Sequence, residues 1–223
     1  MGGAEQAGGV LGKLKFSVER ARTAQLLLSS RVTVERGPVP GIRLVAGLDV
    51  AYARGRAYGA AALVDVEGPR VLERAVSWVE ERVPYIPGFL AFREVGPMVS
   101  VIRRLSERPD ALMVNGHGIA HPRRFGLASH LGVVLGLRSI GVARRRLVGE
   151  EVGQSLILEG EEVARVLRSG RLKIYVSVGH LISLEEAVRL VEATLVSEGK
   201  LPLPVQEAHE AATEAARSLS GDE

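Results

Sequence analysis

Three polar side chains stand where apolar stretches of the sequence end, and together they could hold one metal ion. Asp49 lies in an apolar run, Glu94 follows a proline-rich segment, and Asn115 closes a second apolar run. Burying a carboxylate in such a run costs free energy unless the group is paired or bound to a cation. Because the ends of neighbouring strands lie together, the oxygen atoms of the three side chains can come within a few ångströms of one cation.

Each of these residues also has a simpler interpretation on its own. Asp49 could lie near the end of a strand and face water. Glu94 could be a first-turn acid that the dipole of a following helix favours. Asn115 could adopt a left-handed turn conformation. The three residues indicate a metal site only as a group.

Two histidines, His117 and His121, lie four residues apart, a spacing that on a helix would suit a zinc pair. The glycines and the proline around them argue against a helix at this point. With Arg123 and Arg124 beside them, at the start of a following helix, they fit contact with phosphate better. The glycines match neither a P-loop nor a dinucleotide fingerprint, so no nucleotide cofactor is expected.

The composition limits the classes of protein to which the chain can belong. Its 223 residues are 46% hydrophobic and 25% charged, which is typical of a single globular domain. The absence of cysteine excludes disulfides, thiolate metal sites and a cysteine nucleophile, and it favours a hard cation such as magnesium. No apolar run approaches the roughly 18 to 20 residues that a membrane span needs. Because the start also lacks a signal-peptide pattern, we expect a cytoplasmic protein with no membrane partner.

Charge is unevenly distributed along the chain, although the net charge is only +3. The stretch 111–149 contains no acidic residue, but it contains six arginines and three of the five histidines. From residue 183 onward, nine acidic residues stand against three basic ones. Such segregation also occurs on solvated helices, but here it favours a cationic face that accepts phosphates.

The apolar and turn patterns predict an α/β fold with a mixed central sheet and flanking helices. Three strands joined by short turns are predicted to form an antiparallel meander: 44–52, 58–66 and 71–79. Further strands are expected at 111–114 and 139–143, followed by a pair at 152–158 and 172–178. Helices are expected at 13–28, from about 97 to 106, at 122–135 and, as the last element, at 183–196, where Ser183 and Glu186 form a capping box. Residues 13–223 are predicted to be one domain behind a flexible N-terminus of residues 1–12.

Five stretches, in order along the chain, closely resemble the endonuclease V family of deoxyinosine 3′ endonucleases. They are GLDVAY (47–52), PYIPGFLAFRE (84–94), NGHGIAHPRRFGLASHLG (115–132), IGVA (140–143) and VSVGH (176–180). The match runs from about Gly47 to His209, and the second and third stretches are too long for coincidence. The resemblance implies a ribonuclease H-like fold and cleavage, dependent on Mg²⁺ with Mn²⁺ as a substitute, of the second phosphodiester bond 3′ to a deaminated base, chiefly hypoxanthine.

The resemblance also implies a role for each matching catalytic position. Asp49 and Glu94 stand in place of the family's metal-binding carboxylates, and the third ligand, an Asp in most members, is Asn115 here. His209 matches a C-terminal histidine near the metal site. Arg144 stands where a Lys is expected, and it keeps the positive charge while changing the hydrogen-bond geometry.

The proline-rich loop fits nucleic-acid recognition. A rigid tip that contains Tyr85 and Pro87 could push the Tyr85 ring into a duplex where the damaged base leaves. The alternative is a surface tyrosine packed on its own prolines. The resemblance further implies a base pocket and phosphate contacts: backbone groups near Gly88, Leu90 and Gly116 line the pocket, and His121, Arg123 and Arg144 contact phosphate.

Asn115 leaves more than one function open. Its amide carbonyl can bind magnesium but brings no negative charge. The chain is therefore either an active repair nuclease on DNA containing deoxyinosine, or a protein that binds inosine or branched strands and cuts poorly. Inosine-containing RNA also remains a possible substrate, because no residue settles recognition of the 2′-hydroxyl. We expect a monomer.

Overall fold

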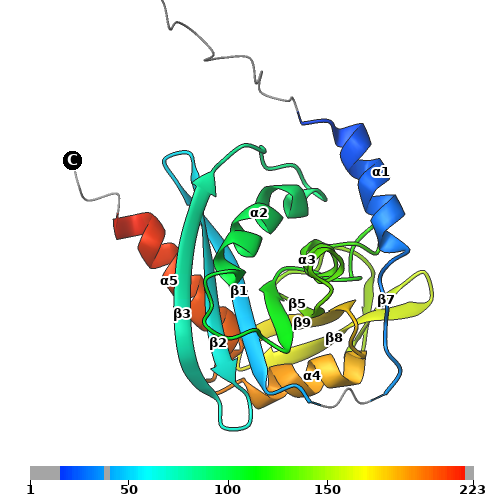
Figure 1. Ribbon diagram of the computed structural model, residues 1–223. Helices are drawn as coiled ribbons and strands as arrows, with labels where there is room; N and C mark the ends of the chain where they lie inside the picture. Colours follow the sequence, from blue (N-terminus) through cyan, green and yellow to red (C-terminus); the bar gives the residue numbers. More distant parts are fainter. Residues whose placement is uncertain (1–15, 38–40, 219–223) are drawn as a thin grey trace, which may run out of the picture.

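The computed structural model describes residues 16–37 and 41–218, so the N-terminus predicted to be flexible lies outside the described residues. Nine strands form one mixed sheet in the order β3-β2-β1-β4-β5-β9-β8-β7-β6 (Figure 1). The strands are β1 Leu44–Ala53, β2 Arg56–Asp65, β3 Arg70–Glu80, β4 Ala111–Asn115, β5 Arg138–Ala143, β6 Glu150–Val152, β7 Ser155–Leu158, β8 Glu161–Ser169 and β9 Leu172–His180. The predicted mixed α/β fold is confirmed.

The first three strands form the predicted antiparallel meander. Arg54 and Gly55, between β1 and β2, both have positive φ angles, of 49° and 72°. Two such residues in succession match the turn that joins antiparallel strands without splaying them. On its other edge β1 pairs in parallel with β4, and β4 pairs in parallel with β5. The carboxyl end of β4 therefore lies beside the middle of β1.

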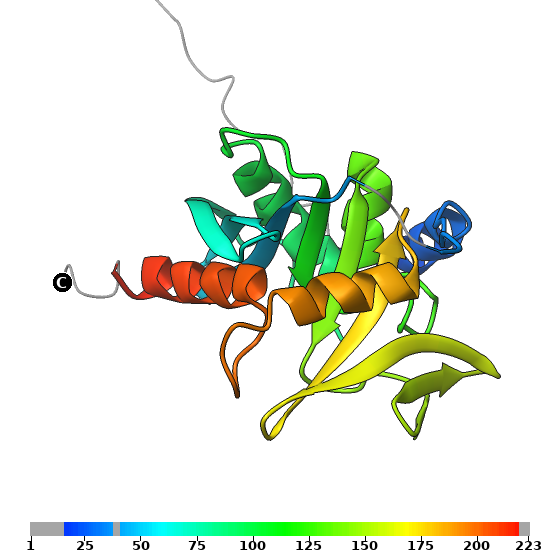
Figure 2. The same cartoon turned by 90° about the horizontal axis from the view of Figure 1, so that it is seen from below.

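Helices cover both faces of the sheet. They are α1 Val18–Ser29, α2 Leu90–Ile102, α3 Leu127–Leu135, α4 Leu184–Ala193 and α5 Leu203–Ser218. Figure 2 shows α4 and α5 following one another along one face, while α2 and α3 lie on the other. Alternate residues of β1 serve the two cores: Val45 packs with residues of α4 and α5, and Leu48 packs with residues of α2 and α3.

The predicted start of the second helix is wrong. It was expected near Pro97, but α2 begins at Leu90 and contains Pro97 in its interior. Burial of Met98 and Val101 on the same face offsets the hydrogen bond that a proline cannot donate. The Pro97 carbonyl packs directly over Gly59, where a Cβ atom would collide with it.

The third helix begins five residues later than predicted. Arg124 has a φ of 52°, which a right-handed helix cannot include, so α3 begins at Leu127. His117 and His121 consequently lie in the loop between β4 and α3, rather than at the start of a helix.

Sequence analysis missed three elements, β6, β8 and α5, and the single strand expected at 152–158 is the hairpin of β6 and β7. Strand β8 stands between β7 and β9, so the predicted pairing of 152–158 with 172–178 is wrong. The helix capped by Ser183, whose Oγ accepts from the Glu186 N–H at 3.1 Å, is confirmed but is not the last element. Helix α5 follows it, with Pro204 at a position in the first turn where a missing N–H costs little.

The first helix is shorter than expected. It begins at Val18, after Ser17, whose Oγ accepts from the Arg20 N–H at 3.3 Å. No helix in the described part of the chain combines the length and the apolar character needed to cross a membrane.

Candidate active site and base cavity

Asp49, in the middle of β1, lies beside Asn115, the last residue of the adjacent parallel strand β4. The register of β1 on β4 pairs Leu48 with Val114, so the next residues along both strands are Asp49 and Asn115. The Asn115 Nδ2 donates to Asp49 Oδ1 at 3.0 Å. Asp49 is only 8% exposed, which excludes the interpretation that it faces water. Asn115 is the last residue of β4, in extended conformation, so it does not occupy a left-handed turn.

His209 reaches Asp49 from helix α5. Its Nδ1 donates to Asp49 Oδ2 at 2.7 Å. Gly47, on the same face of β1 as Asp49, makes this contact possible, because a Cβ atom there would collide with the backbone of Pro204. The hydrogen bond to Asp49, reinforced by the aspartate charge, raises the pKa of His209. The imidazole is thus favoured in its protonated form.

Glu94 belongs to the second turn of α2 and is 7% exposed. It is therefore not the first-turn acid of this helix. The Tyr52 hydroxyl donates to its Oε1 at 3.3 Å. Burial, and then the negative charge of Asp49, raise the pKa of Glu94 to about 8, against the opposing effects of Tyr52 and Arg93. Two buried carboxylates therefore repel each other across this site.

Arg144 lies at the rim of the same cluster. It is exposed directly after β5, and its charge acts on His209, where it lowers the pKa. A cavity of about 500 Å³ is lined by Asn115, His117 and Arg144, among others. The structure thus brings together the residues that the sequence assigned to catalysis: Asp49, Glu94, Asn115, His209 and Arg144.

The donor set of this cluster fits a hard cation. Two carboxylates and an amide carbonyl are oxygen ligands of the kind that Mg²⁺ and Mn²⁺ bind. Burial, and then the charge of Asp49, raise the pKa of Glu94, and a cation held between the two carboxylates would favour their charged forms. Within residues 16–37 and 41–218, no group of three His, Cys, Asp or Glu side chains is arranged to hold a metal, and the third oxygen donor at this cluster is Asn115.

A second cavity, of about 330 Å³, adjoins the cluster. It is lined by most of the residues that the sequence assigned to base recognition: Tyr85, Gly88, Leu90, Gly116 and His121. The Tyr85 side chain is 62% exposed at its edge, and Pro87 lies in the same loop. These roles stay predictions, but the residues come from separate segments of the chain and face one space.

His121 and Arg123 both contact the Gly88 carbonyl. The His121 Nδ1 accepts from the Arg123 N–H at 3.2 Å, so the proton of the neutral ring lies on Nε2, which donates to Gly88 O at 3.2 Å. Burial, and then the charge of Arg123, lower the pKa of His121 to about 4. His121 is therefore neutral near pH 7, so that any contact with phosphate would be through a neutral ring.

Sequence analysis missed two side chains that contact this site. Tyr52 lies within the GLDVAY motif, so its nearness to Asp49 in the sequence was an available signal. Gln25 on α1 bonds to the Gly88 carbonyl at 3.0 Å, and a single glutamine in a helix gives no such signal.

Comparison with known proteins identifies the chain's relatives. A family model described as endonuclease V matches residues 27–210. The endonuclease V of Aeropyrum pernix is 44% identical over 197 residues, which cover 86% of this chain and 77% of the relative. That of Thermus thermophilus is 41% identical over 215 residues, covering 90% of this chain and 94% of the relative.

Solved structures share the fold. The endonuclease V of Streptomyces avermitilis superposes with a TM-score of 0.83 at 35% identity, covering 92% of this chain and 95% of that one. A Ciona intestinalis endonuclease V, solved in complex with a 24mer DNA containing an inosine followed by a ribo-adenosine, has a TM-score of 0.80 at 23% identity, covering 91% and 98%. The fold is thus the ribonuclease H-like fold of these proteins, and the chain belongs to the endonuclease V family of nucleases, which hydrolyse phosphodiester bonds.

Proposed function

We propose that this protein recognises a deaminated base, chiefly hypoxanthine, in DNA and hydrolyses the second phosphodiester bond on its 3′ side with the help of a divalent cation. One observation carries the proposal: the carboxylate cluster and the 330 Å³ cavity adjoin, since Asn115 of the cluster and Gly116 of the cavity are consecutive residues. A base held in the cavity would place the strand that carries it beside the cluster. The inosine-containing DNA bound by the Ciona relative supports the same substrate class.

The carboxylates of Asp49 and Glu94 and the amide carbonyl of Asn115 would hold the cation, which we propose is Mg²⁺ or Mn²⁺. Such a cation, when bound, stabilises the negative charge that develops on the phosphate and activates water. Glu94 acts as a ligand in its charged form, which is favoured above its pKa of about 8 or whenever a positive charge is present. The cluster therefore favours cation binding at neutral to alkaline pH.

The other side chains of the cluster orient these ligands and meet the substrate. His209 Nδ1 donates to Asp49 Oδ2 and fixes the direction of its carboxylate. The Tyr52 hydroxyl does the same for Glu94, and burial raises the pKa of Tyr52, so that it remains a donor. Arg144, exposed at the rim, would contact the phosphate of the bound strand.

A second function is favoured by the contact between Asn115 and Asp49. The neutral amide gives the cluster one negative charge fewer than an Asp would. Its Nδ2 also donates a hydrogen bond to Asp49 Oδ1, an oxygen that could otherwise bind the cation. Weaker cation binding would leave recognition of the base intact while slowing cleavage. The alternative is accordingly a protein that binds inosine-containing or branched strands and cuts poorly.

Single-turnover cleavage of a labelled duplex with one deoxyinosine separates these functions. Mg²⁺ is titrated, with Mn²⁺, Zn²⁺ and EDTA in parallel, and an undamaged duplex and an inosine-containing RNA serve as comparison substrates. We expect Mg²⁺ or Mn²⁺, and not Zn²⁺, to support cleavage, because the ligands are oxygen atoms. Selective binding without product would establish the binding protein instead, and faster cleavage of the RNA would identify a ribonuclease.

The variants Asp49→Ala and Glu94→Ala test the ligand assignment in the same assay. Each removes a carboxylate that the cation would need, so both should abolish cleavage while thermal unfolding shows that the variants fold. Full activity in both variants would contradict the metal site.

A further inference from the structure

Gln25 is a buried polar side chain in an otherwise peripheral helix. It is 1% exposed, although its neighbours Leu26 and Leu27 on α1 are 53% and 68% exposed. A buried amide requires hydrogen-bond partners. The partners of Gln25 lie outside its own helix: it bonds to Gly88, and both residues line the 330 Å³ cavity. It lies two residues before the region matched by the family model, which begins at residue 27.

Both ends of the Gln25 amide are engaged. Its Nε2 donates to the Gly88 carbonyl at 3.0 Å and lies 3.5 Å from the Phe125 carbonyl. Its Oε1 accepts from Arg123 Nε at 2.6 Å. Arg123 Nη2 donates in turn to Gly88 O at 2.6 Å. Gln25, Arg123 and Gly88 therefore form a closed ring of hydrogen bonds.

The glycine at position 88 is required by this ring. Gly88 has a φ of 79°, and a Cβ atom there would lie 3.0 Å from Arg123 Nη2. The Arg123 guanidinium also stacks on the Phe89 ring, 4.5 Å from its centroid. The loop that carries Tyr85 is thus fixed at its C-terminal end, because Gln25, Arg123 and His121 all donate hydrogen bonds to the Gly88 carbonyl.

We propose that Gln25 is a positioning residue for recognition of the base: through the Gly88 carbonyl and Arg123 it holds the Tyr85 loop and the wall of the cavity in place. This inference rests on the proposed function, because it assumes that the cavity takes a deaminated base. It assigns Arg123 to the support of the loop rather than to direct contact with phosphate. It also makes α1 part of the recognition site.

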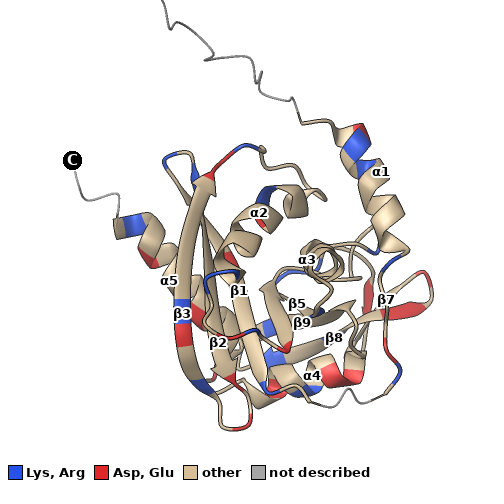
Figure 3. Cartoon of the chain, viewed as in Figure 1, with Lys and Arg blue, Asp and Glu red and all other residues tan. Residues whose placement is uncertain are grey.

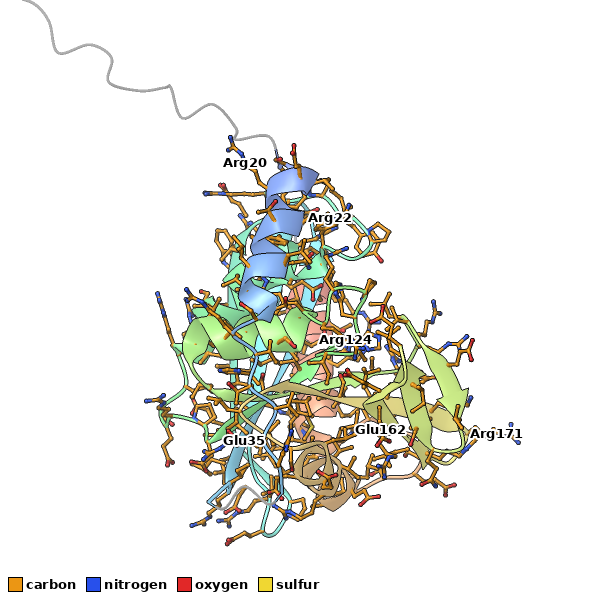
Figure 4. All side chains as sticks on the ribbon, turned by 90° about the vertical axis from the view of Figure 1, so that its right-hand side faces the viewer. Arg20, Arg22, Glu35, Arg124, Glu162 and Arg171 are labelled. Atoms are coloured by element: carbon orange, nitrogen blue, oxygen red, sulfur yellow. The ribbon has the colours of Figure 1, made fainter. Side chains whose placement is uncertain are left out.

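The arrangement of α1 agrees with such a role. Phe16, just before the helix, packs edge-on against Phe89 and Phe92, with ring centroids 6.3 and 5.8 Å apart. Figure 4 shows α1, marked by Arg20 and Arg22, standing above the segment that carries Arg124. The aromatic contacts hold α1 against α2 but tolerate a range of orientations. The hydrogen bond from the Gln25 amide is directional, so it fixes the position of the Gly88 carbonyl.

Gln25→Met tests the proposal because methionine keeps the length of the side chain and removes both hydrogen bonds. Affinity is measured by fluorescence anisotropy in EDTA, for a duplex with one deoxyinosine and for the same duplex without it. A 2-aminopurine beside the deoxyinosine reports extrusion of the base. We expect affinity for the deoxyinosine duplex to fall about 10-fold, the effect of losing roughly one buried hydrogen bond, together with a loss of the 2-aminopurine signal. Affinity for the undamaged duplex should stay unchanged.

The matched control is Thr23→Ala. Thr23 is exposed on the same helix, and its hydroxyl bonds to the Glu19 carbonyl of that helix. It should bind both duplexes as the unaltered protein does. If Gln25→Met does not fold, as judged by thermal unfolding, Gln25→Glu replaces it: the carboxylate still accepts from Arg123 but repels the Gly88 carbonyl, so it should lower selectivity in the same direction.

A double-mutant cycle with Arg123→Met distinguishes support of the loop from phosphate binding. If both residues act on Gly88, the double variant loses little more selectivity than either single variant. Independent losses, with Arg123→Met weakening both duplexes equally, would overturn the assignment of Arg123. Unchanged selectivity and 2-aminopurine signal in Gln25→Met would overturn the positioning role alone. An unaltered protein without preference for deoxyinosine would instead overturn the proposed function, and the positioning role with it.

Discussion

The two carboxylate oxygens of Asp49 face different partners, and this asymmetry defines the candidate active site. Oδ2 accepts from His209, whose pKa this hydrogen bond raises, while Oδ1 accepts from the neutral Asn115 amide. A carboxylate at position 115 could not donate to Asp49. The two acids would repel each other unless a cation lay between them. Residue 115 therefore determines how strongly the cluster requires a metal.

Asn115→Asp should raise cleavage by at least about 100-fold, a magnitude typical of groups that organise charge in a transition state. The added carboxylate strengthens cation binding and leaves the base cavity unchanged. Single-turnover rates of both forms on one deoxyinosine duplex, at saturating Mg²⁺, measure the chemical step apart from binding. If the Asn form already cuts as fast as the Asp form, the third carboxylate is dispensable and the binding-protein alternative fails.

Tyr85→Ala should weaken binding to a deoxyinosine duplex by roughly 1 to 3 kcal/mol, the usual contribution of an aromatic ring that stacks on a base. The Tyr85 side chain is 62% exposed at the edge of the cavity, so it is free to enter a duplex. Single-stranded substrate should be affected less, because no stack has to be opened. Tyr85→Phe, which keeps the ring, is the control, and equal losses on both substrates would mean that Tyr85 only shapes the loop.

The residues of the cluster were predictable because strand ends and motif positions identify them. Asp49 lies within an apolar run and Asn115 ends another, and the parallel pairing of the two strands places the two residues side by side. Gln25 was not predictable, because its importance depends on a carbonyl 63 residues away in the chain. The contacts of Arg123 with Gln25 and Gly88 were not predictable for the same reason, and its contact with phosphate stays a prediction.

At the scale of elements, α2 and α3 pack against each other through a histidine. The His130 ring lies 5.3 Å from that of Phe92 and 5.0 Å from that of Phe125, and its Nδ1 is buried without a partner among the described residues. Burial lowers the pKa of His130 to about 4. The packing of α2 on α3 therefore favours the neutral form of the His130 ring.

Acid should consequently destabilise this packing. An unfolded His130 takes up a proton below about pH 6.5, whereas the folded ring does so only near pH 4, so stability is lost as the pH falls between these values. At about pH 5 the loss amounts to about 2 kcal/mol for this residue. Urea denaturation at about pH 7.5 and pH 5 measures it, and His130→Leu should remove that part of the pH dependence. Identical pH dependence in both proteins would contradict the assignment.

The elements that local patterns define were predictable, and those that depend on distant contacts were not. The meander has short turns and continuous apolar strands, so its boundaries are nearly as expected. Pro97 indicated the start of a helix, but it lies in the interior of α2, where it packs against Gly59 of β2. Helix α5 begins directly after Pro202 and contains Pro204 in its first turn. These prolines obscured its start, although its alanine-rich sequence favours a helix.

At the scale of the whole molecule, acidic and basic residues are interspersed over most of the surface, and many of them form ion pairs. Figure 3 shows acidic residues on α4 and around β7. The arginine run 144–146 is exposed at the rim of the two cavities, whereas Arg124 of the same cationic stretch is paired with Glu159 and Glu161. We therefore expect the phosphate-accepting face to be narrower than the sequence indicated and to be centred on residues 144–146.

Binding of undamaged duplex should therefore depend on salt through these three arginines. Replacing Arg144, Arg145 and Arg146 with Ala should reduce the slope of log affinity against log salt concentration by about 0.9 for each phosphate that the protein no longer neutralises. Arg171 is the control, since Figure 4 shows it at the tip of the β8–β9 turn, away from Arg124. An unchanged slope in the triple variant would mean that other residues bind the phosphates.

The peptide bond between Asn115 and Gly116 joins the carboxylate cluster, where the strand would be cut, to the cavity, where the base would bind. No hinge or domain boundary separates the two, because both residues end the same central strand or follow it directly. Under the proposed function, we expect the protein rather than the DNA sequence to set the distance between the lesion and the nick. An enzyme built in this way leaves its nick at a constant number of nucleotides from any base that the cavity accepts, whatever sequence surrounds it.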